Sequence, residues 1–456
     1  MISHRRTFLK ALGGAPGLLS GARAASRRPN IVLIMADDLG SGDLSSYGCP
    51  DIRTPHIDSI GRRGVRFSRF YANAPECTPT RTALLTGRYQ QRVGGLECAI
   101  GVGDQGRYDE AMWLQKRGDL GLPVSETSMP RMLQSAGYDT GCFGKWHLGY
   151  PQKFWPIRHG FDESFGILGG NADYFTHKEQ DGRPVLYRND RLEARKGYVT
   201  DLITEEALGW LKRRGSAPFF LYVPFTTPHT PIQDPDGFDP TTGTARWQQG
   251  NRAVYAKMVE RMDRGVGEIL AQIERMGAAE RTIVVYLSDN GGDSNGRNAP
   301  LRGRKSSVWE GGIRVPCMVR WPGVLSEGRT VSQVGLSMDL LPTFLAAAGA
   351  QAPAGRKLDG VDLLPVMAGK REPFSRTVFW RYKRANNRRK AVLHGSLKLV
   401  MDNDQQELHD LSTDEPEKKD LLPTSPAIAQ ALKDRLAAWE REVAAPRLRD
   451  FRPGAA

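Results

Sequence analysis

A single cysteine stands where its neighbours suggest chemistry rather than burial. In "ECTPTRTALLTGRY" (Glu76 to Tyr89), Cys77 comes just before a proline and an arginine at the entry of a predicted short helix. Cys142 and Cys317 lie instead in apolar, strand-like segments, where plain burial is the better interpretation. The five cysteines form no CxxC pair and show no zinc-ligand spacing. Their odd number leaves at least one unpaired or altered, and Cys77 is the candidate.

Two pairs of oxygen-bearing side chains follow two apolar segments that are far apart in the sequence. "NIVLIMADD" ends in Asp37 and Asp38, and "RTIVVYLSDNGG" repeats the design with Asp289 and Asn290. Adjacent acids at a strand end are also common as caps or turn residues, so one pair alone would decide nothing. Two such pairs favour a metal site, and ligands that offer only oxygen select a hard cation. We expect Ca²⁺, with Mg²⁺ as the less suitable ion.

Three short segments carry candidate catalytic histidines and lysines. "GKWHLGY" spaces Lys145 and His147 two residues apart, on one face if the segment is extended. "PFTTPHTP" ends another predicted strand with His229 between prolines that fix its backbone. "LRGRKSSVWEGGIRVP" offers Lys305 in a glycine-flanked loop. Each residue alone is more typical of a structural or surface position, so its meaning depends on where the fold places it.

The elements that must position these residues alternate along the chain. "NIVLIMADD", "YDTGCFGKW", "APFFLYVPF" and "RTIVVYLSDNGG" are predicted buried strands. Predicted helices between and after them are "SETSMPRMLQSAG", "TDLITEEALGWLKRR", "NRAVYAKMVERMDRGVGEILAQIERMG" and "SMDLLPTFLAAAG". This alternation predicts an α/β fold with a largely parallel sheet. Ligands of such sheets gather beyond the carboxyl ends of the strands, where both acidic pairs are expected.

The length and composition predict one large domain with a smaller appendage. The chain has 456 residues, of which 39% are hydrophobic and 25% charged, enough for a sizeable core. After a Gly/Pro-rich passage (349–373), short alternating segments at hairpin spacing and a last helix near Ala427 to Val443 predict a small antiparallel sheet. We therefore predict a catalytic domain over residues 29–370 and a C-terminal subdomain over residues 371–456.

The first 24 residues are typical of a twin-arginine signal peptide. Arg5 and Arg6 precede a short, weakly apolar run that ends in the small-x-small pattern Ala22-Arg23-Ala24. The run is too short and too rich in glycine and proline for a membrane span, and no other segment is long and apolar enough, so we expect no stable membrane insertion. We expect an exported protein, periplasmic or extracellular.

The charge favours an anionic partner. The formal net charge is +13, and the four cations of the predicted signal leave +9 for the rest of the chain. The sequence shows no nucleic-acid-binding motif, and an exported protein rarely meets chromosomal DNA, so we expect no nucleic acid. An acidic polysaccharide or a small anionic ester fits better.

Several ordered motifs resemble the type I sulfatase family, which belongs to the alkaline phosphatase superfamily. Cys77-Thr78-Pro79-Thr80-Arg81, followed by Leu85-Thr86-Gly87-Arg88, matches the family signature, with Thr80 where serine is commoner. "MADDLG", "GKWHLG", "PHTP", "SDNGG", "WEGGIRVP" and "ELHDLSTDEPEKKDL" extend the resemblance over nearly the whole chain after the signal. The resemblance implies a large mixed, mostly parallel sheet sandwiched by helices, with a small C-terminal antiparallel-sheet subdomain.

The family resemblance also implies how Cys77 acts. In this family a formylglycine-generating maturation enzyme oxidises the cysteine to formylglycine, and the hydrated aldehyde, a geminal diol, is the nucleophile that releases sulfate from the ester. The implied cation ligands are Asp37, Asp38, Cys77 after conversion, Asp289 and Asn290. The implied catalytic residues are Cys77, Arg81, which stabilises the formylglycine, Lys145 and Lys305, which neutralise sulfate, His147, a proton acceptor, and His229, a proton donor.

Other activities stay open. A cysteine-dependent phosphatase is not among them, because it needs a longer spacing between cysteine and arginine than that from Cys77 to Arg81. A phosphodiester or phosphonate monoester hydrolase of the same superfamily can share the formylglycine, cation and fold. A non-catalytic protein that binds sulfated glycans would keep the basic surface with an unmodified Cys77.

The sequence also offers candidates for substrate contacts. We expect a sulfated carbohydrate or an aryl sulfate, and a polar aromatic loop, "NADYFTHKEQDG" (Asn171 to Gly182), is the predicted contact segment through His177. Additional cations favour a sulfated sugar, although "KRANNRRK" can equally be a solvated loop. These cations are Lys178, Arg384, Arg388, Arg389 and Lys390.

Overall fold

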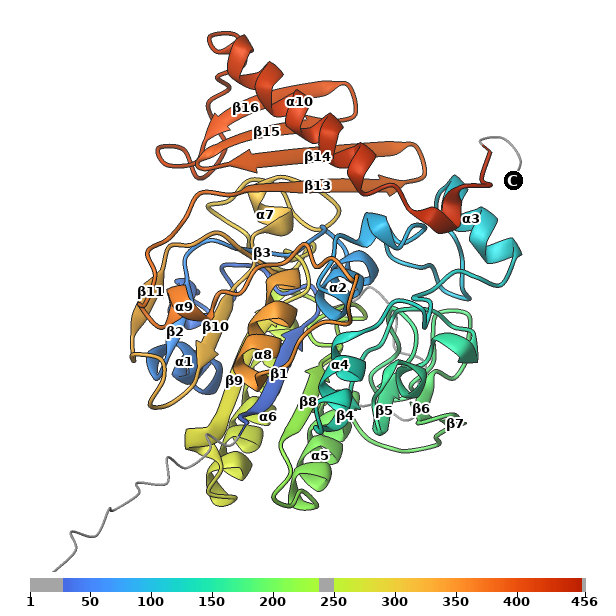
Figure 1. Ribbon diagram of the computed structural model, residues 1–456. Helices are drawn as coiled ribbons and strands as arrows, with labels where there is room; N and C mark the ends of the chain where they lie inside the picture. Colours follow the sequence, from blue (N-terminus) through green and yellow to red (C-terminus); the bar gives the residue numbers. More distant parts are fainter. Residues whose placement is uncertain (1–27, 238–249, 453–456) are drawn as a thin grey trace, which may run out of the picture.

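The computed structural model describes residues 28–237 and 250–452 (Figure 1). The predicted twin-arginine signal, residues 1–24, lies outside these ranges. Within them, no helix combines the length and apolar character needed to cross a membrane.

A ten-stranded mixed sheet forms the centre of the molecule. The four strands in its middle, β9, β1, β8 and β4, are parallel, and the antiparallel partners lie toward the edges. In spatial order the strands are β11 (Arg329–Val331), β2 (Val65–Phe67), β10 (Cys317–Arg320), β9 (Thr282–Ser288), β1 (Asn30–Ala36), β8 (Phe219–Pro224), β4 (Asp139–Phe143), β5 (Glu163–Ile167), β6 (Leu186–Arg188) and β7 (Arg191–Leu192). The expected α/β class with a mostly parallel sheet is confirmed.

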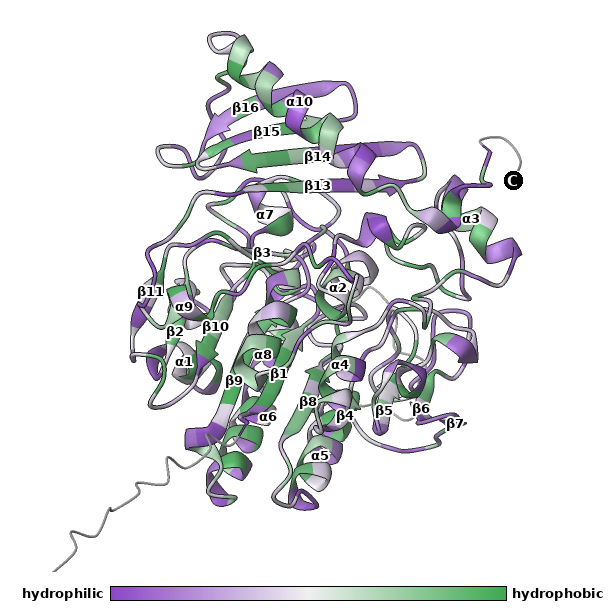
Figure 2. Cartoon of the chain, in the orientation of Figure 1, coloured by the Kyte–Doolittle hydropathy of each residue, from purple (hydrophilic) through white to green (hydrophobic). Residues whose placement is uncertain are grey.

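Helices cover both faces of this sheet, which explains the unbroken apolar runs of its central strands. Along β1, Ile31, Leu33 and Met35 pack into one hydrophobic cluster, while Val32 and Ile34 pack into the other. A strand buried on both faces needs apolar side chains at every position rather than at alternate ones. Figure 2 shows the hydrophobic residues gathered along the central strands.

The helices divide between the two clusters. The first cluster holds buried residues of α2 (Cys77–Thr86), α4 (Met129–Ser135) and α8 (Leu340–Ala348), and the second holds those of α1 (Pro55–Arg62), α5 (Val199–Lys212) and α6 (Arg252–Arg275). Four predicted helices are thus present, and α8 ends at Gly349, which has the left-handed φ of 60°. Shorter elements complete the domain: β3 (Phe70–Tyr71), β12 (Gly335–Leu336), α3 (Asp109–Lys116), α7 (Glu310–Ile313) and α9 (Leu364–Met367).

A separate four-stranded antiparallel sheet follows, as expected. Its strands are β13 (Thr377–Arg384), β14 (Asn387–His394), β15 (Leu397–Asp402) and β16 (Gln405–Asp410), followed by α10 (Pro426–Glu442). Figure 1 shows this sheet above the end of the main sheet where α2 lies. The "KRANNRRK" segment belongs to strands β13 and β14 and to the turn between them, so it is not simply a solvated loop.

A buried ion cluster joins the small sheet to the large domain. Lys398 of β15 is fully buried and bonds Glu310 of α7 at 2.8 Å and Glu417 at 2.8 Å. Glu310 also accepts a hydrogen bond from the Tyr71 hydroxyl. Arg314 lies 3.5 Å from Glu310 as well, but Lys398 is the cation at hydrogen-bond distance from both carboxylates.

Replacing Lys398 by alanine is therefore expected to destabilise the fold by about 3–5 kcal/mol, because two buried carboxylates lose the cation that bridges them. The free energy of unfolding from urea titration measures this loss. Lys390→Ala is the matched control, since its ion pair with Glu440 is part-exposed and is expected to contribute about 1 kcal/mol or less. Equal losses in both variants would contradict the role of the buried cluster.

Candidate active site

The carboxyl ends of four neighbouring strands bring the candidate residues together. Strands β1 and β9 run parallel, with Ala36 opposite Ser288, so Asp37 and Asp289 follow directly as neighbours. On the other side of β1, strand β8 leads to His229, and β4 beyond it leads to Lys145 and His147. Neighbouring parallel strands end at the same edge of a sheet, and the convergence expected from the sequence is present.

The acids form a buried cluster suited to a cation. Carboxylate oxygens of Asp37, Asp38 and Asp289 lie within 4.8 Å of one another, and all three residues are buried. Asp37 Oδ1 and Asn290 Oδ1 are buried without a hydrogen-bond partner. Buried oxygens without a donor are costly unless something else binds them. This donor set, entirely of oxygen, fits a divalent hard cation such as Ca²⁺.

Three cationic side chains surround the acids. Lys145 Nζ lies 2.6 Å from Asp37 Oδ2, and Lys305 Nζ lies 2.6 Å from Asp38 Oδ2. Arg81 donates to Asp289 Oδ2 from Nε at 3.1 Å and from Nη2 at 2.9 Å. Such a cluster of fixed positive charge can stabilise an oxyanion in a site with little water.

The surroundings shift the pKa values of Asp289 and Asp38 in opposite directions. Burial and the neighbouring Asp37 carboxylate raise the pKa of Asp289 to about 7. Burial also disfavours ionisation of Asp38, but the cationic Lys305 and Lys145 hold the pKa of Asp38 below its ordinary value. Ionised carboxylates this close repel one another, so a cation bound between them would stabilise their charged forms.

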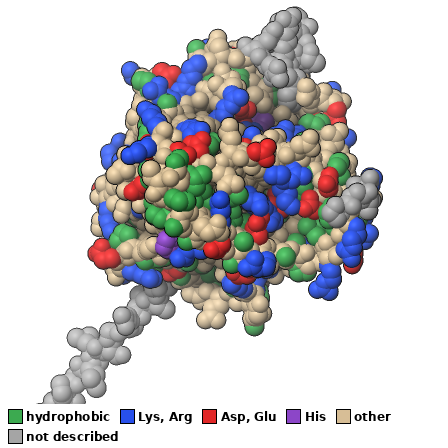
Figure 3. Space-filling view, turned by 90° about the horizontal axis from the view of Figure 1, so that it is seen from above, with side chains coloured by type: hydrophobic (Ala, Val, Ile, Leu, Met, Phe, Trp, Pro, Cys, Tyr) green, Lys and Arg blue, Asp and Glu red, His purple; other side chains and the backbone are tan. Residues whose placement is uncertain are grey.

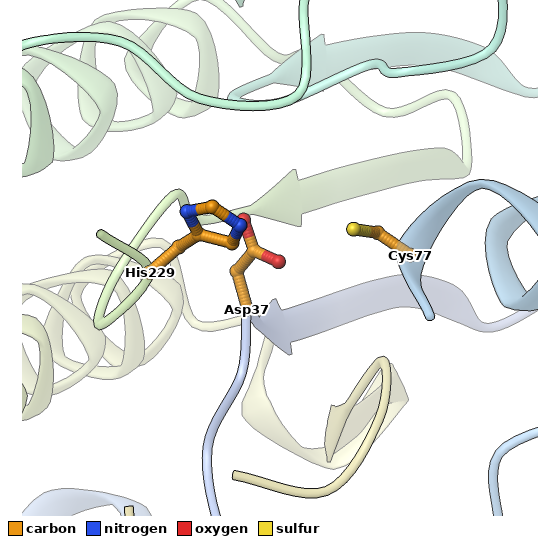
Figure 4. Close-up of side chains that lie close together, drawn as sticks. All are labelled: Asp37, Cys77 and His229. Carbon is orange, nitrogen blue, oxygen red and sulfur yellow. The ribbon is translucent and has the colours of Figure 1, made fainter. Parts of the chain in front are cut away.

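Cys77 is the first residue of α2, and Figure 4 shows its sulfur pointing toward Asp37, with His229 on the far side of Asp37. Possible ligand atoms of these three residues lie within 4.8 Å of one another. The helix begins at Cys77 itself, which the sequence placed at the helix entry. The thiol thus lies at the positive end of the helix dipole. Burial nevertheless raises the pKa of Cys77 to about 11, so the unmodified side chain is a neutral thiol at pH 7.

Hydrogen bonds fix the tautomer of each candidate histidine. His147 Nε2 lies 2.9 Å from the Ile100 carbonyl, which can only accept, so Nε2 carries the hydrogen. Its Nδ1 is buried without a partner and keeps a free lone pair. His229 Nδ1 likewise donates to the Thr230 carbonyl at 2.7 Å, and its Nε2 accepts from Lys305 Nζ at 3.0 Å.

The surroundings keep both imidazoles neutral. Burial and Lys145 lower the pKa of His147 well below its ordinary value. Burial and Lys305 lower the pKa of His229 to about 3. His147 is thus arranged as a proton acceptor, whereas the proton shared by His229 and Lys305 lies on the lysine.

Sequence reasoning missed Glu76, the residue before Cys77. Its buried carboxylate accepts hydrogen bonds from four separate positions: Ala99 N at 2.7 Å, Ser306 Oγ at 2.7 Å, the Tyr382 hydroxyl at 2.9 Å and Arg384 Nη1 at 2.6 Å. Burial opposes its ionisation, but Arg384 and the Ala99 N–H lower the pKa of Glu76 below its ordinary value. The carboxylate thereby ties the start of α2 to the Lys305 loop and to β13. The sequence offered one signal for a role of Glu76, which is its position next to Cys77.

A cavity of about 250 Å³ opens over these side chains. Its lining includes Cys77, His147, His229 and Lys305, and also residues that the sequence did not single out as catalytic: Glu76, Ala99, Ile100, Val102, Arg107, Gly170, Asn171, Gln180, Asp293, Ser306 and Arg384. The predicted contact loop contributes Asn171 and Gln180.

His177 is not among the residues that line the cavity. It is buried, and its Nε2 lies 3.0 Å from the Gly197 carbonyl. This contact ties the imidazole to the segment that precedes α5, and the role of His177 as a substrate contact stays a prediction. The Asn171 to Gly182 loop does reach the cavity, through Asn171 and Gln180.

Comparison with protein-family models identifies the chain. Residues 29–350 match the sulfatase model, and residues 304–442 match the model described as N-sulphoglucosamine sulphohydrolase, C-terminal. The chain belongs to the sulfatase family. This sulfatase is accordingly a sulfuric ester hydrolase.

Relatives and solved structures agree. The sulfatase is 35% identical to the N-acetylgalactosamine-6-sulfatase of Canis lupus familiaris over 76% of the chain and 68% of the relative. It is 34% identical to the steryl-sulfatase of Mus musculus, over 76% of the chain and 66% of the relative. The crystal structure of Ps i-CgsB in complex with k-i-k-neocarrahexaose matches with a TM-score of 0.81 and 30% identity, over 91% of this chain and 93% of that one.

The fold alone is shared more widely. A phosphonate monoester hydrolase of Agrobacterium radiobacter matches with a TM-score of 0.64 and 20% identity, over 91% of the sulfatase and 96% of that chain.

Proposed function

We propose that this sulfatase releases inorganic sulfate from a sulfated carbohydrate or aryl sulfate, using formylglycine derived from Cys77 and a divalent cation. The observation that carries the proposal is the meeting of Cys77, the oxygen cluster and His229 at one edge of the sheet. We propose further that the protein is exported to the periplasm or beyond, and that a formylglycine-generating maturation enzyme acts on it first.

Asp37, Asp38, Asp289 and Asn290 would hold the cation, with Ca²⁺ more suitable than Mg²⁺ for this set of carboxylate and amide oxygens. A cation bound there supplies positive charge that polarises the sulfate oxygens. The two buried oxygens without hydrogen-bond partners, on Asp37 and Asn290, support this assignment.

The modification at residue 77 supplies what a thiol or a simple alcohol lacks. A hydrated aldehyde carries one hydroxyl to attack sulfur and a second whose deprotonation allows sulfate to leave. The buried, neutral thiol would be a weak nucleophile by comparison. Arg81, held by Asp289 and by the Lys145 carbonyl at 2.9 Å, is placed to stabilise the modified side chain.

The remaining residues would neutralise charge and transfer protons. Lys145 and Lys305 would neutralise the sulfate oxygens. His147, with its free Nδ1 lone pair, would take the proton of the second hydroxyl. His229 and Lys305, which share a hydrogen bond, would together protonate the leaving alcohol.

The substrate class follows from the cavity and the relatives. The cavity lining is mostly polar and includes Arg107, Lys305 and Arg384, as suits an anionic sugar. Two of the matched proteins carry sugars in their names, N-acetylgalactosamine-6-sulfatase and the complex with k-i-k-neocarrahexaose. A sulfated sugar is therefore the favoured substrate.

Comparing matched aryl esters tests the reaction class. The purified protein is expected to hydrolyse 4-nitrophenyl sulfate with a kcat/KM at least about 100-fold above that for an aryl phosphonate monoester. The reverse order would support the phosphonate or phosphodiester hydrolase alternative, whose fold is shared. An unmodified thiol at residue 77, together with no hydrolysis of either ester, would support a non-catalytic glycan-binding protein.

A further inference from the structure

Two arginines beside the sulfate pocket form a pair whose charge is only partly matched. Arg107 precedes α3, and Arg384 ends β13 of the C-terminal sheet. The two segments meet there, since the amide of Ala385 donates to the Arg107 carbonyl at 2.6 Å. Both arginine side chains line the same cavity as Cys77 and His229.

The acids nearby leave this pair with excess positive charge. Arg384 bonds Glu76 through Nη1 at 2.6 Å, and 38% of its side chain is still exposed. Arg107 is half-buried, and within residues 28–237 and 250–452 no acidic side chain lies at ion-pair distance from it. Asp293 is the other acid of the cavity lining, whereas the Glu76 carboxylate is already engaged by four donors.

Neighbouring cations on the same strand show the contrast. Lys383 bonds Glu110 at 2.6 Å, and Arg381 bonds Glu97 through Nε at 2.6 Å and through Nη2 at 2.9 Å. These charges are compensated inside the protein. Arg107 and Arg384 instead line the cavity, and guanidinium groups bind oxyanions through paired N–H donors.

We propose that Arg107 and Arg384 form a second anion subsite, which binds a further sulfate or a carboxylate on the sugar while its scissile sulfate occupies the site at Cys77. The proposal rests on the proposed sulfatase function and narrows its substrate to multiply charged sugars. Figure 3 shows Lys and Arg side chains spread over this face of the molecule, with acidic side chains among them.

Calorimetric binding of three disaccharides with one common backbone tests the subsite. One carries a single sulfate, one carries two sulfates, and one carries one sulfate and one carboxylate. Titrations use the full chain with Cys77→Ala, so that no ligand is consumed, at about 0.15 M ionic strength, where distant charges are screened. At least one doubly charged disaccharide is expected to bind about tenfold more tightly than the monosulfated one.

The variants decide whether the arginines cause this preference. Arg107→Ala removes no ion pair. Added to the Cys77→Ala chain, it is expected to bring the ratio of the affinities for the doubly charged and the monosulfated disaccharide close to one. Arg384→Ala is expected to do the same. Arg388→Ala is the matched control: it removes one positive charge from the same hairpin, but Arg388 lies outside the cavity lining and bonds only backbone carbonyls of its own turn. The control is expected to keep the ratio.

Absence of tighter binding by either doubly charged disaccharide would overturn the subsite, as would a ratio that survives both Arg107→Ala and Arg384→Ala. Whichever doubly charged ligand is preferred distinguishes a second sulfate from a carboxylate. Turnover of 4-nitrophenyl sulfate by the unmutated chain is measured separately, because its failure would count against the proposed function and not against the subsite.

Discussion

Cys77→Ser is expected to lower steady-state turnover of 4-nitrophenyl sulfate by roughly 10⁴-fold or more while leaving one rapid turnover per molecule. A serine hydroxyl can attack sulfur in the same place, but the sulfated serine has no second hydroxyl whose deprotonation expels the sulfate. The expected record is a burst of up to one equivalent of nitrophenol. Mass spectrometry of the peptide with residue 77 is expected to show an added sulfate group.

Cys77→Ala is the matched control, with no burst and no added mass, because alanine offers no oxygen to attack sulfur. Cys49→Ser controls for the loss of a thiol elsewhere, since Cys49 lies near Asp51 and Arg252 and outside the cavity lining. Normal multiple turnover by Cys77→Ser would contradict the proposed need for an aldehyde.

Asp37→Asn is expected to weaken binding of the divalent cation by about 100-fold or more and to lower kcat by a similar or larger factor. The change keeps the shape of the side chain and removes one negative charge from the buried cluster. It also removes the anionic partner of Lys145, whose Nζ lies 2.6 Å away. Calorimetric titration with Ca²⁺ and elemental analysis of dialysed protein measure the binding independently of activity.

Asp43→Asn is the control for this variant. Asp43 is also buried after β1, but its two carboxylate oxygens are engaged by Gly40 N, the Tyr255 hydroxyl, Arg252 and the Arg297 amide. Its cation affinity is expected to match that of the unmutated protein. If Asp37→Asn bound Ca²⁺ as tightly as the unmutated chain, the assignment of the oxygen cluster as the cation site would be wrong.

The parts of the site that follow strands were predictable from the sequence. An apolar run buried on both faces must end where the sheet ends, so the sequence alone predicts Asp37 and Asp289 at one edge of the sheet. His229 and Lys145 follow the same logic, because each comes shortly after a strand neighbouring β1 or β8. The resemblance of the Cys77 motif to the sulfatase family added the nature of the reaction.

The parts built from loops and from the C-terminal sheet were not predictable. Arg107 lies in a stretch with no periodic pattern, and its proximity to Arg384 arises only when the β13–β14 turn docks on it. The absence of His177 from the cavity lining has the same cause, since a loop's sequence does not say which of its side chains faces the cavity. The ion cluster of Lys398 likewise joins residues that are distant in sequence and unremarkable in local context.

The most direct measurement is the mass of the peptide that contains residue 77, taken from enzyme that hydrolyses 4-nitrophenyl sulfate and was produced together with a maturation enzyme. The mass of the aldehyde or its hydrate in place of the thiol is the predicted result. An active preparation in which residue 77 is entirely the unmodified cysteine would contradict the account.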